Sequence, residues 1–243
     1  KISGETQTEE EMLELRNITY EVEDNQDNKE ILKDVSLTID EHFVAITGPN
    51  GGGKSTLAKV LMGIEKASAG QIILDGEDIS NYDINHRADA GIGYAFQQPP
   101  RFKGMTVMKL LSLSAGKELK REECCKLLST VGLCANEYIE REVDGTLSGG
   151  EMKRLEIATV LAKSHKLCIF DEPEAGIDLW SFNSLIKVFE KMRDEINGTI
   201  LIISHQERIL DIADKIIVIA DGQVRKTGTK AEVLPELLNT AQT

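Results

Sequence analysis

The chain has 243 residues, with 28 Lys and Arg against 41 Asp and Glu, which gives a formal net charge of −13 at pH 7. This acidic balance opposes contact with nucleic-acid backbones and anionic membrane surfaces, and the apolar runs are far shorter than the roughly 20 residues that span a bilayer. We therefore expect a cytoplasmic protein with no nucleic-acid partner and no direct membrane insertion.

The N-terminal part is predicted to begin with disorder and to continue as an antiparallel hairpin. Residues 1–11 are polar and acidic, and we expect them to be disordered, with a single domain following over residues 12–243. Apolar side chains at largely alternating positions predict strands over Met12–Val22 and Ile31–Ile39. The polar insert Glu23–Glu30 between them is predicted to be the hairpin loop.

The rest of the chain is predicted to alternate strands and helices around one helical insertion. An apolar strand at His42–Thr47 runs into glycines, and a helix follows at Ser55–Met62. Helical spacing over Thr106–Asn136 predicts an inserted helical subdomain at about residues 100–160. Three strands and two helices are then predicted in alternation at Leu167–Phe170, Leu179–Arg193, Thr199–Ile203, Ile209–Ala213 and Ile216–Ile219. This α/β order favours a mostly parallel sheet covered on both faces.

A phosphate-binding loop is the most specific motif in the chain. The segment between the strand and the helix matches G-x-x-x-x-G-K-[ST], in the structural context that this motif requires. Glycines allow backbone N–H groups to converge on phosphate oxygens, and a lysine adds a mobile cation. We expect ATP or GTP to contact Gly48, Pro49, Asn50, Gly51, Gly52, Gly53, Lys54, Ser55 and Thr56.

An acidic pair follows the apolar strand Leu167–Phe170. A carboxylate at the C-terminal end of such a strand would lie beside a phosphate loop, so Asp171 is expected to hold Mg²⁺ together with the Ser55 hydroxyl. Glu172 comes one residue later, where it would orient or deprotonate the attacking water. A solvated strand end is the alternative for this pair, and the phosphate loop argues against it.

The segment Leu147–Glu151 (LSGGE) resembles the signature motif of the ABC ATPase family. The resemblance covers about Met12 to Thr229 and implies a P-loop NTPase core with an antiparallel β subdomain and the helical insertion. It implies that Tyr20 stacks on adenine, that Gln97 reaches Mg²⁺ and the attacking water, and that His205 senses the γ-phosphate. Tyr20 could instead be a core aromatic, His205 a strand-end histidine, and Gln98 the residue that faces the metal.

The same resemblance implies an ATP-dependent homodimer. Ser148, Gly149 and Gly150 form a second set of backbone donors before a helix N-terminus, which one ATP cannot easily reach together with the phosphate loop of the same chain. In the family this element closes over the nucleotide of the other subunit, giving a two-fold pair with two ATP molecules in its seam. Asp178 would cross to the partner as well.

Within the family, three local strings resemble the ATPase of the SUF iron–sulfur cluster assembly machinery, SufC. These are Ala95–Pro99, Ser148–Ile157 and Ser204–Leu210, and Glu156 is the main difference from transporter ATPases. The implied partner is a SufB/SufD-like scaffold. The alternative is the ATP-binding subunit of a membrane transporter, and Pro173 favours it because a proline is common at this position in transporter ATPases. A DNA-bound ABC ATPase is disfavoured by the acidic charge, and the cysteine spacing suggests no metal site in this chain.

Overall fold

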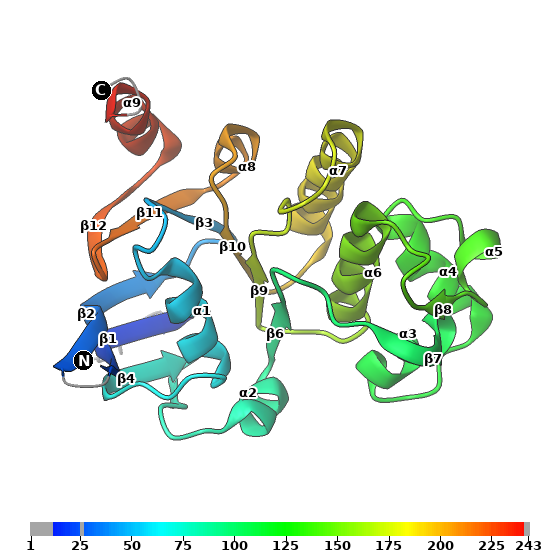
Figure 1. Ribbon diagram of the computed structural model, residues 1–243, viewed down its shortest axis with the longest axis horizontal. Helices are drawn as coiled ribbons and strands as arrows, with labels where there is room; N and C mark the ends of the chain where they lie inside the picture. Colours follow the sequence, from blue (N-terminus) through cyan, green and yellow to red (C-terminus); the bar gives the residue numbers. More distant parts are fainter. Residues whose placement is uncertain (1–11, 25–26, 241–243) are drawn as a thin grey trace, which may run out of the picture.

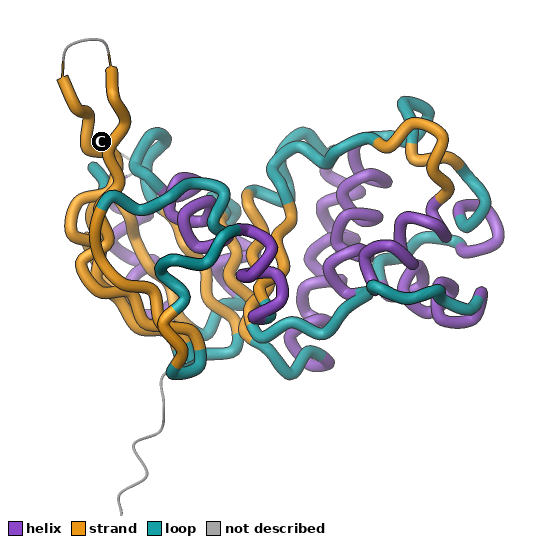
Figure 2. The backbone as a smooth tube through the Cα atoms, turned by 90° about the horizontal axis from the view of Figure 1, so that it is seen from below, coloured by secondary structure: helices purple, strands orange, loops and turns teal. Residues whose placement is uncertain are grey.

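The computed structural model describes residues 12–24 and 27–240 (Figure 1). The predicted disorder at residues 1–11 lies outside this part. Figure 2 shows most of the strands gathered on one side of the molecule and most of the helical turns on the other. Within the described residues no helix is both long enough and apolar enough to cross a membrane.

The central sheet has six strands, of which five run parallel. Its strands, in spatial order, are β12 (Gln223–Gly228), β11 (Lys215–Ala220), β3 (Phe43–Thr47), β10 (Thr199–Ile203), β9 (Leu167–Asp171) and β6 (Ile92–Ala95). Every residue of β3, β9 and β10 is buried, as expected of parallel strands covered on both faces. The α/β fold with a mostly parallel sheet is therefore confirmed, and β12 is an antiparallel edge.

A second, antiparallel sheet packs over helix α1 (Lys54–Met62) and the central sheet. Its strands are β2 (Asp27–Ile39), β1 (Leu13–Asp24), β4 (Ala69–Leu74) and β5 (Glu77–Asp78). The predicted hairpin loop at Glu23–Glu30 was too long, because β1 reaches Asp24 and β2 begins at Asp27. Cross-strand pairing, such as Val22 with Lys29, extends the hairpin through the polar insert.

Helices α3 (Val107–Ala115), α4 (Arg121–Thr130), α5 (Ala135–Tyr138) and α6 (Gly149–Leu161) form the helical part on the far side of β6 (Figure 1). Two short strands that the sequence did not indicate, β7 (Phe102–Thr106) and β8 (Glu142–Val143), pair beside them. One apolar core continues from these helices to α7 (Leu179–Glu195) and the central sheet. The remaining helices are α2 (Ile84–Ala90), α8 (Glu207–Asp211) and α9 (Lys230–Thr240).

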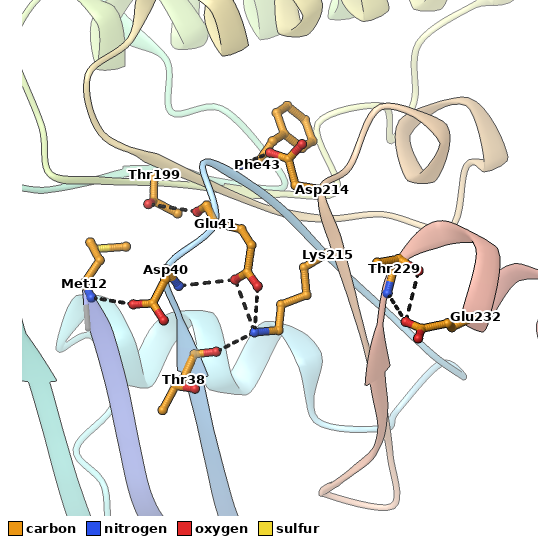
Figure 3. Close-up of polar contacts among 10 residues, drawn as sticks. All are labelled: Met12, Thr38, Asp40, Glu41, Phe43, Thr199, Asp214, Lys215, Thr229 and Glu232. Carbon is orange, nitrogen blue, oxygen red and sulfur yellow. Dashed lines mark hydrogen bonds and ion pairs between the residues drawn. The ribbon is translucent and has the colours of Figure 1, made fainter. Parts of the chain in front are cut away.

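Polar contacts join the two sheets at the end where β2 turns into β3 (Figure 3). The Lys215 ammonium, at the start of β11, donates to the Thr38 carbonyl at 3.0 Å and lies 3.1 Å from the Glu41 carboxylate. Asp214 accepts from the Phe43 amide at 2.9 Å. These contacts fix the amino ends of β3 and β11, so the opposite ends of the strands are left for the site.

Candidate functional site

The phosphate loop joins the carboxyl end of β3 to the first turn of α1. Gly48 has φ 135°, and a Cβ there would lie 2.0 Å from the Ile219 carbonyl oxygen of β11. Gly53 has φ 101° and precedes the first helical residue. Only glycine meets both demands, because a side chain would collide with the neighbouring strand or strain the backbone.

The Lys54 side chain lies inside the loop. Its ammonium donates to the carbonyls of Gly48 and Pro49, at 2.8 Å each, and the residue is 5% exposed. Burial lowers the pKa of Lys54, although Glu172 and Asp171 act in the opposite direction. A phosphate anion would give this confined cation the counter-charge that two neutral carbonyls do not supply.

A cavity of about 350 Å³ opens over the loop. The residues of its wall are Lys29, Ile31, Asn50, Gly51, Gly52, Gly53, Lys54, Ser55, Thr56 and Glu172. Lys29 and Ile31 were not indicated by the sequence, since β2 carries no motif and reaches the loop only through tertiary packing. The backbone confirms this approach, because the Lys33 amide donates to the Gly222 carbonyl at 2.8 Å beside the loop.

Asp171 ends β9 next to the loop. It accepts hydrogen bonds from the Ser55 hydroxyl at 2.9 Å and from the Tyr94 hydroxyl at 3.2 Å. Burial raises the pKa of Asp171, and these two hydrogen bonds only partly oppose that rise. The Ser55 hydroxyl and the Asp171 carboxylate are the hard oxygen donors that Mg²⁺ prefers, and a cation here would offset the burial of the carboxylate. The residues present therefore fit the metal.

Glu172 holds the next position in a left-handed backbone conformation, with φ 46°. Such a conformation costs a non-glycine residue free energy and is common at functional sites. The Gln97 amide donates to its Oε2 at 2.5 Å, and His205 Nε2 lies 3.6 Å from its Oε1. Burial and the charge on Lys54 lower the pKa of His205, although Glu172 opposes them. Gln97, rather than Gln98, thus makes the contact with Glu172.

The signature segment, Leu147–Glu151, lies at the start of α6. Ser148 caps the helix by accepting from the Glu151 amide, and the Glu151 carboxylate accepts from the Ser148 amide at 2.7 Å. Gly149 lines a second cavity of about 500 Å³, together with Gln97. Asp178 caps α7 by accepting from Ser181, whose hydroxyl leaves no room for a Cβ at Gly150.

The hydroxyl of Tyr20 is directed away from the phosphate loop, although its backbone pairs with Leu32, which lies beside Gly53. Its hydroxyl donates to the Glu65 carboxylate at 2.6 Å, just beyond the C-terminal end of α1. The phosphate loop precedes the other end of this nine-residue helix, about 13 Å away along its axis. Tyr20 packs against the core between the sheets and is absent from the described cavity wall. Stacking of Tyr20 on adenine remains a prediction.

Two variants of Tyr20 separate a role in stability from a role in stacking on adenine. We expect Tyr20→Phe to lower the free energy of unfolding by about 1 kcal/mol, because it removes the hydrogen bond to Glu65. Tyr20→Leu removes the aromatic ring, and the placement of Tyr20 predicts an ATP dissociation constant within twofold of the parent. Denaturant unfolding and calorimetric titration measure both quantities. A tenfold weaker affinity in the folded Leu variant would establish stacking.

A buried ion pair on α6 contacts the segment that carries Gln97. Lys153 and Glu156 are 3% and 8% exposed, and their charged groups are 3.8 Å apart. The Lys153 ammonium donates to the carbonyls of Phe96 at 2.8 Å and Gln97 at 2.5 Å. Glu156 Oε1 accepts from the Phe96 amide at 2.6 Å. The sequence identified Glu156 as unusual but did not indicate this contact.

Glu156 should make stability depend on pH. Burial raises its pKa to about 7, while the facing charge of Lys153 and the Phe96 amide act in the opposite direction. Tyr94 from β6 also faces it. Between about pH 4.5 and 7 the folded chain holds a proton that the unfolded chain has released, so this contribution to stability is present at low pH and is lost as pH rises.

The measurement compares the parent with Glu156→Gln over this range. We expect the parent's unfolding equilibrium to shift towards the unfolded state by as much as about tenfold per pH unit, relative to the variant. Denaturant midpoints at half-unit steps of pH measure the shift. Parallel curves for the two proteins would show that Glu156 does not titrate in this range.

Comparisons with known proteins agree with this arrangement. The profile of the family described as "ABC transporter" matches residues 32–175, which is more than half of the chain. An uncharacterised ABC transporter ATP-binding protein of Methanocaldococcus jannaschii is 42% identical over 85% of this chain and 86% of that protein. The lipopolysaccharide export system ATP-binding protein LptB of Haemophilus influenzae is 32% identical, over 85% and 88%.

Solved structures resemble the fold as a whole. A dimeric ATP-binding cassette in a post-hydrolysis state, bound to ADP and Pi, has a TM-score of 0.81 at 24% identity, covering 90% of this chain and 99% of that one. A nucleotide-free cassette from an ABC transporter has a TM-score of 0.78 at 27% identity, covering 94% and 95%. With the phosphate loop, the acidic pair and the signature segment in place, the chain belongs to the ABC family of ATPases and hydrolyses ATP.

Proposed function

We propose that this chain hydrolyses MgATP in the seam of a head-to-tail pair and uses the closure of that pair to drive a partner. The observation that carries the proposal is the placement of Glu172, which lies beside the Ser55–Asp171 pair and contacts both Gln97 and His205. A carboxylate that accepts a hydrogen bond from Gln97 and lies 3.6 Å from His205, at the mouth of a phosphate site, is suited to orient a water molecule.

Each residue then has a defined role in the reaction. Lys54 and the loop amides bind the phosphates, and Ser55, Asp171 and the Gln97 amide oxygen would hold Mg²⁺. When bound, the metal would neutralise negative charge on the phosphates. Glu172 orients the water and receives its proton, and His205, whose pKa is lowered by burial and by the charge on Lys54, donates a hydrogen bond to the γ-phosphate.

A second copy completes the site. Ser148 is the N-cap residue of α6 and Gly150 lies in its first turn, and Gly149 between them lines a different cavity from the phosphate loop. The Ser148 hydroxyl, the backbone donors of the first turn and the positive N-terminus of α6 suit the terminal phosphate of the other chain's ATP. Hydrolysis in this scheme needs the closed pair, and ATP favours that pair by binding to it more tightly.

For the partner, we propose a membrane transporter that this chain serves as the ATP-binding subunit. The printed names of the relatives support this reading, since they describe ATP-binding proteins of transporters and of an export system. The second candidate is a SufB/SufD-like scaffold for iron–sulfur cluster assembly. The buried contact of Glu156, at the position where the chain differs from transporter ATPases, is the observation that favours it.

Affinity capture from the native cell separates the two readings. The tagged chain is recovered in parallel from the soluble and the detergent-extracted membrane fractions, and its partners are identified by mass spectrometry. A stoichiometric protein with many membrane spans supports the transporter reading and removes the scaffold. A stoichiometric soluble partner that holds an iron–sulfur cluster supports the scaffold instead.

A further inference from the structure

The Gln97 segment depends on α6 for its backbone hydrogen bonds. Phe96 and Gln97 follow the last residue of β6, so they have left the ladder with β9. Lys153 and Glu156 replace the missing strand partner, with the lysine donating to two successive carbonyls and the glutamate accepting from the Phe96 amide. Two residues one helical turn apart thus hold three backbone groups of this segment.

Gln97, which α6 holds through its carbonyl, also contacts the carboxylate of Glu172. The Gln97 carbonyl is held by Lys153, and the side chain of the same residue donates to Glu172 at 2.5 Å. Moving the backbone of Gln97 by 1 Å would break or misalign that hydrogen bond. Burial lowers the pKa of Lys153, and the negative charges of Asp171, Glu172 and Glu174 act in the opposite direction. The pair therefore lies between the start of α6 and the catalytic group.

We propose that Lys153 and Glu156 are positioning residues, which hold Gln97 on Glu172 and make the activity of Glu172 depend on where α6 lies. The inference rests on the proposed roles of Gln97 and Glu172. Ser148 is five residues from Lys153, about 7.5 Å along the helix. An α6 that shifts when its N-terminus meets the ATP of the second copy would carry Gln97 with it.

A purely structural role is the alternative, and the energetics of buried pairs permit a test. Burying two charges costs about as much as their attraction returns, so an apolar pair of similar volume is often neutral for stability. Replacing both charges should therefore preserve the fold while releasing Gln97. Replacing only one leaves an uncompensated buried charge and is strongly destabilising.

A double-mutant cycle tests whether the pair acts through Gln97. Steady-state ATP hydrolysis by the full chain is measured for the parent, Lys153→Met/Glu156→Leu, Gln97→Ala and the combination. We expect the pair variant to lose about tenfold in kcat, with KM for ATP within twofold, because only positioning is lost. In the Gln97→Ala background the same change should cost less than twofold. An undiminished loss in that background, or a loss confined to KM, would overturn the proposal.

Hydrogen exchange provides a readout that does not depend on catalysis. The peptide around Phe96 should exchange faster in the pair variant than in the parent, and unchanged exchange there would also overturn the proposal. Arg87→Met is the matched control, since Arg87 is a buried cation that donates to the carbonyls of Val60 and Leu61. It should lower stability and leave kcat and this peptide unchanged. A parent chain without ATPase activity would defeat the catalytic roles, whereas the exchange result still decides whether α6 fixes Gln97.

Discussion

Replacing Glu172 with Gln is expected to lower kcat by about a thousandfold and to leave ATP binding intact. The amide cannot accept a proton from the attacking water, and general-base catalysis contributes on the order of 10²–10⁴ in rate. Because ATP is bound but not consumed, the closed pair should accumulate. Steady-state hydrolysis gives the rate, and size-exclusion chromatography with light scattering gives the mass with and without MgATP.

The control for this variant is Glu190→Gln, which removes the same charge from an exposed position of α7. It should hydrolyse ATP at the parent rate and show no ATP-dependent change in mass beyond that of the parent. A Glu172→Gln protein that turns over at the parent rate would remove Glu172 from the catalytic role. One that is slow but stays monomeric with MgATP would contradict the link between retained ATP and closure.

Replacing Ser148 with Arg is expected to lower kcat by about a hundredfold without weakening ATP binding to the single chain. The large side chain would stand at the N-terminus of α6, where the second copy's phosphate is proposed to bind, and would block the signature contact at that site. Ser148 is absent from the described wall of the phosphate cavity, so the dissociation constant of ATP should change less than twofold. Calorimetric titration and steady-state hydrolysis measure the two effects.

Mixing two inactive variants tests whether the site is shared between chains. Lys54→Ala loses the phosphate cation, and Ser148→Arg loses the signature contact. In a mixed pair, one of the two sites combines an intact phosphate loop with an intact signature segment, so an equal mixture should recover up to about a quarter of the parent rate. No recovery above the sum of the separate variants would contradict composite sites.

The residues proposed to contact the phosphates could be predicted because short motifs carry them. The phosphate loop needs glycines at set positions beside a lysine, and Asp171 and Glu172 end an apolar strand. The structure places these groups together, with Ser55 on Asp171. Gln97 and His205 were predicted from the family resemblance. The Gln97 amide donates to the Glu172 carboxylate, and His205 Nε2 lies 3.6 Å from it.

The remaining contacts depend on packing between distant segments, which leaves no local pattern. Tyr94 reaches Asp171 across 77 positions of sequence, and Lys29 reaches the cavity because β2 crosses the phosphate loop. Tyr20 illustrates the converse, since an aromatic at a suggestive place in the chain has its hydroxyl at the opposite end of α1. The hairpin insert was misjudged because polar residues can continue a two-stranded ribbon, and the neighbouring residues Val22, Lys29 and Glu30 are exposed.

At Glu172, the left-handed backbone favours one residue for stability and the proposed chemistry requires another. A glycine would adopt φ 46° at little cost, so the residue that best suits the local backbone is one that has no carboxylate. Because Glu172 is the proposed base for hydrolysis, selection for thermostability alone would favour proteins that lack this activity. Screens that seek hardier versions of this chain therefore need turnover as a second criterion, or they will enrich well-folded chains that have lost the reaction.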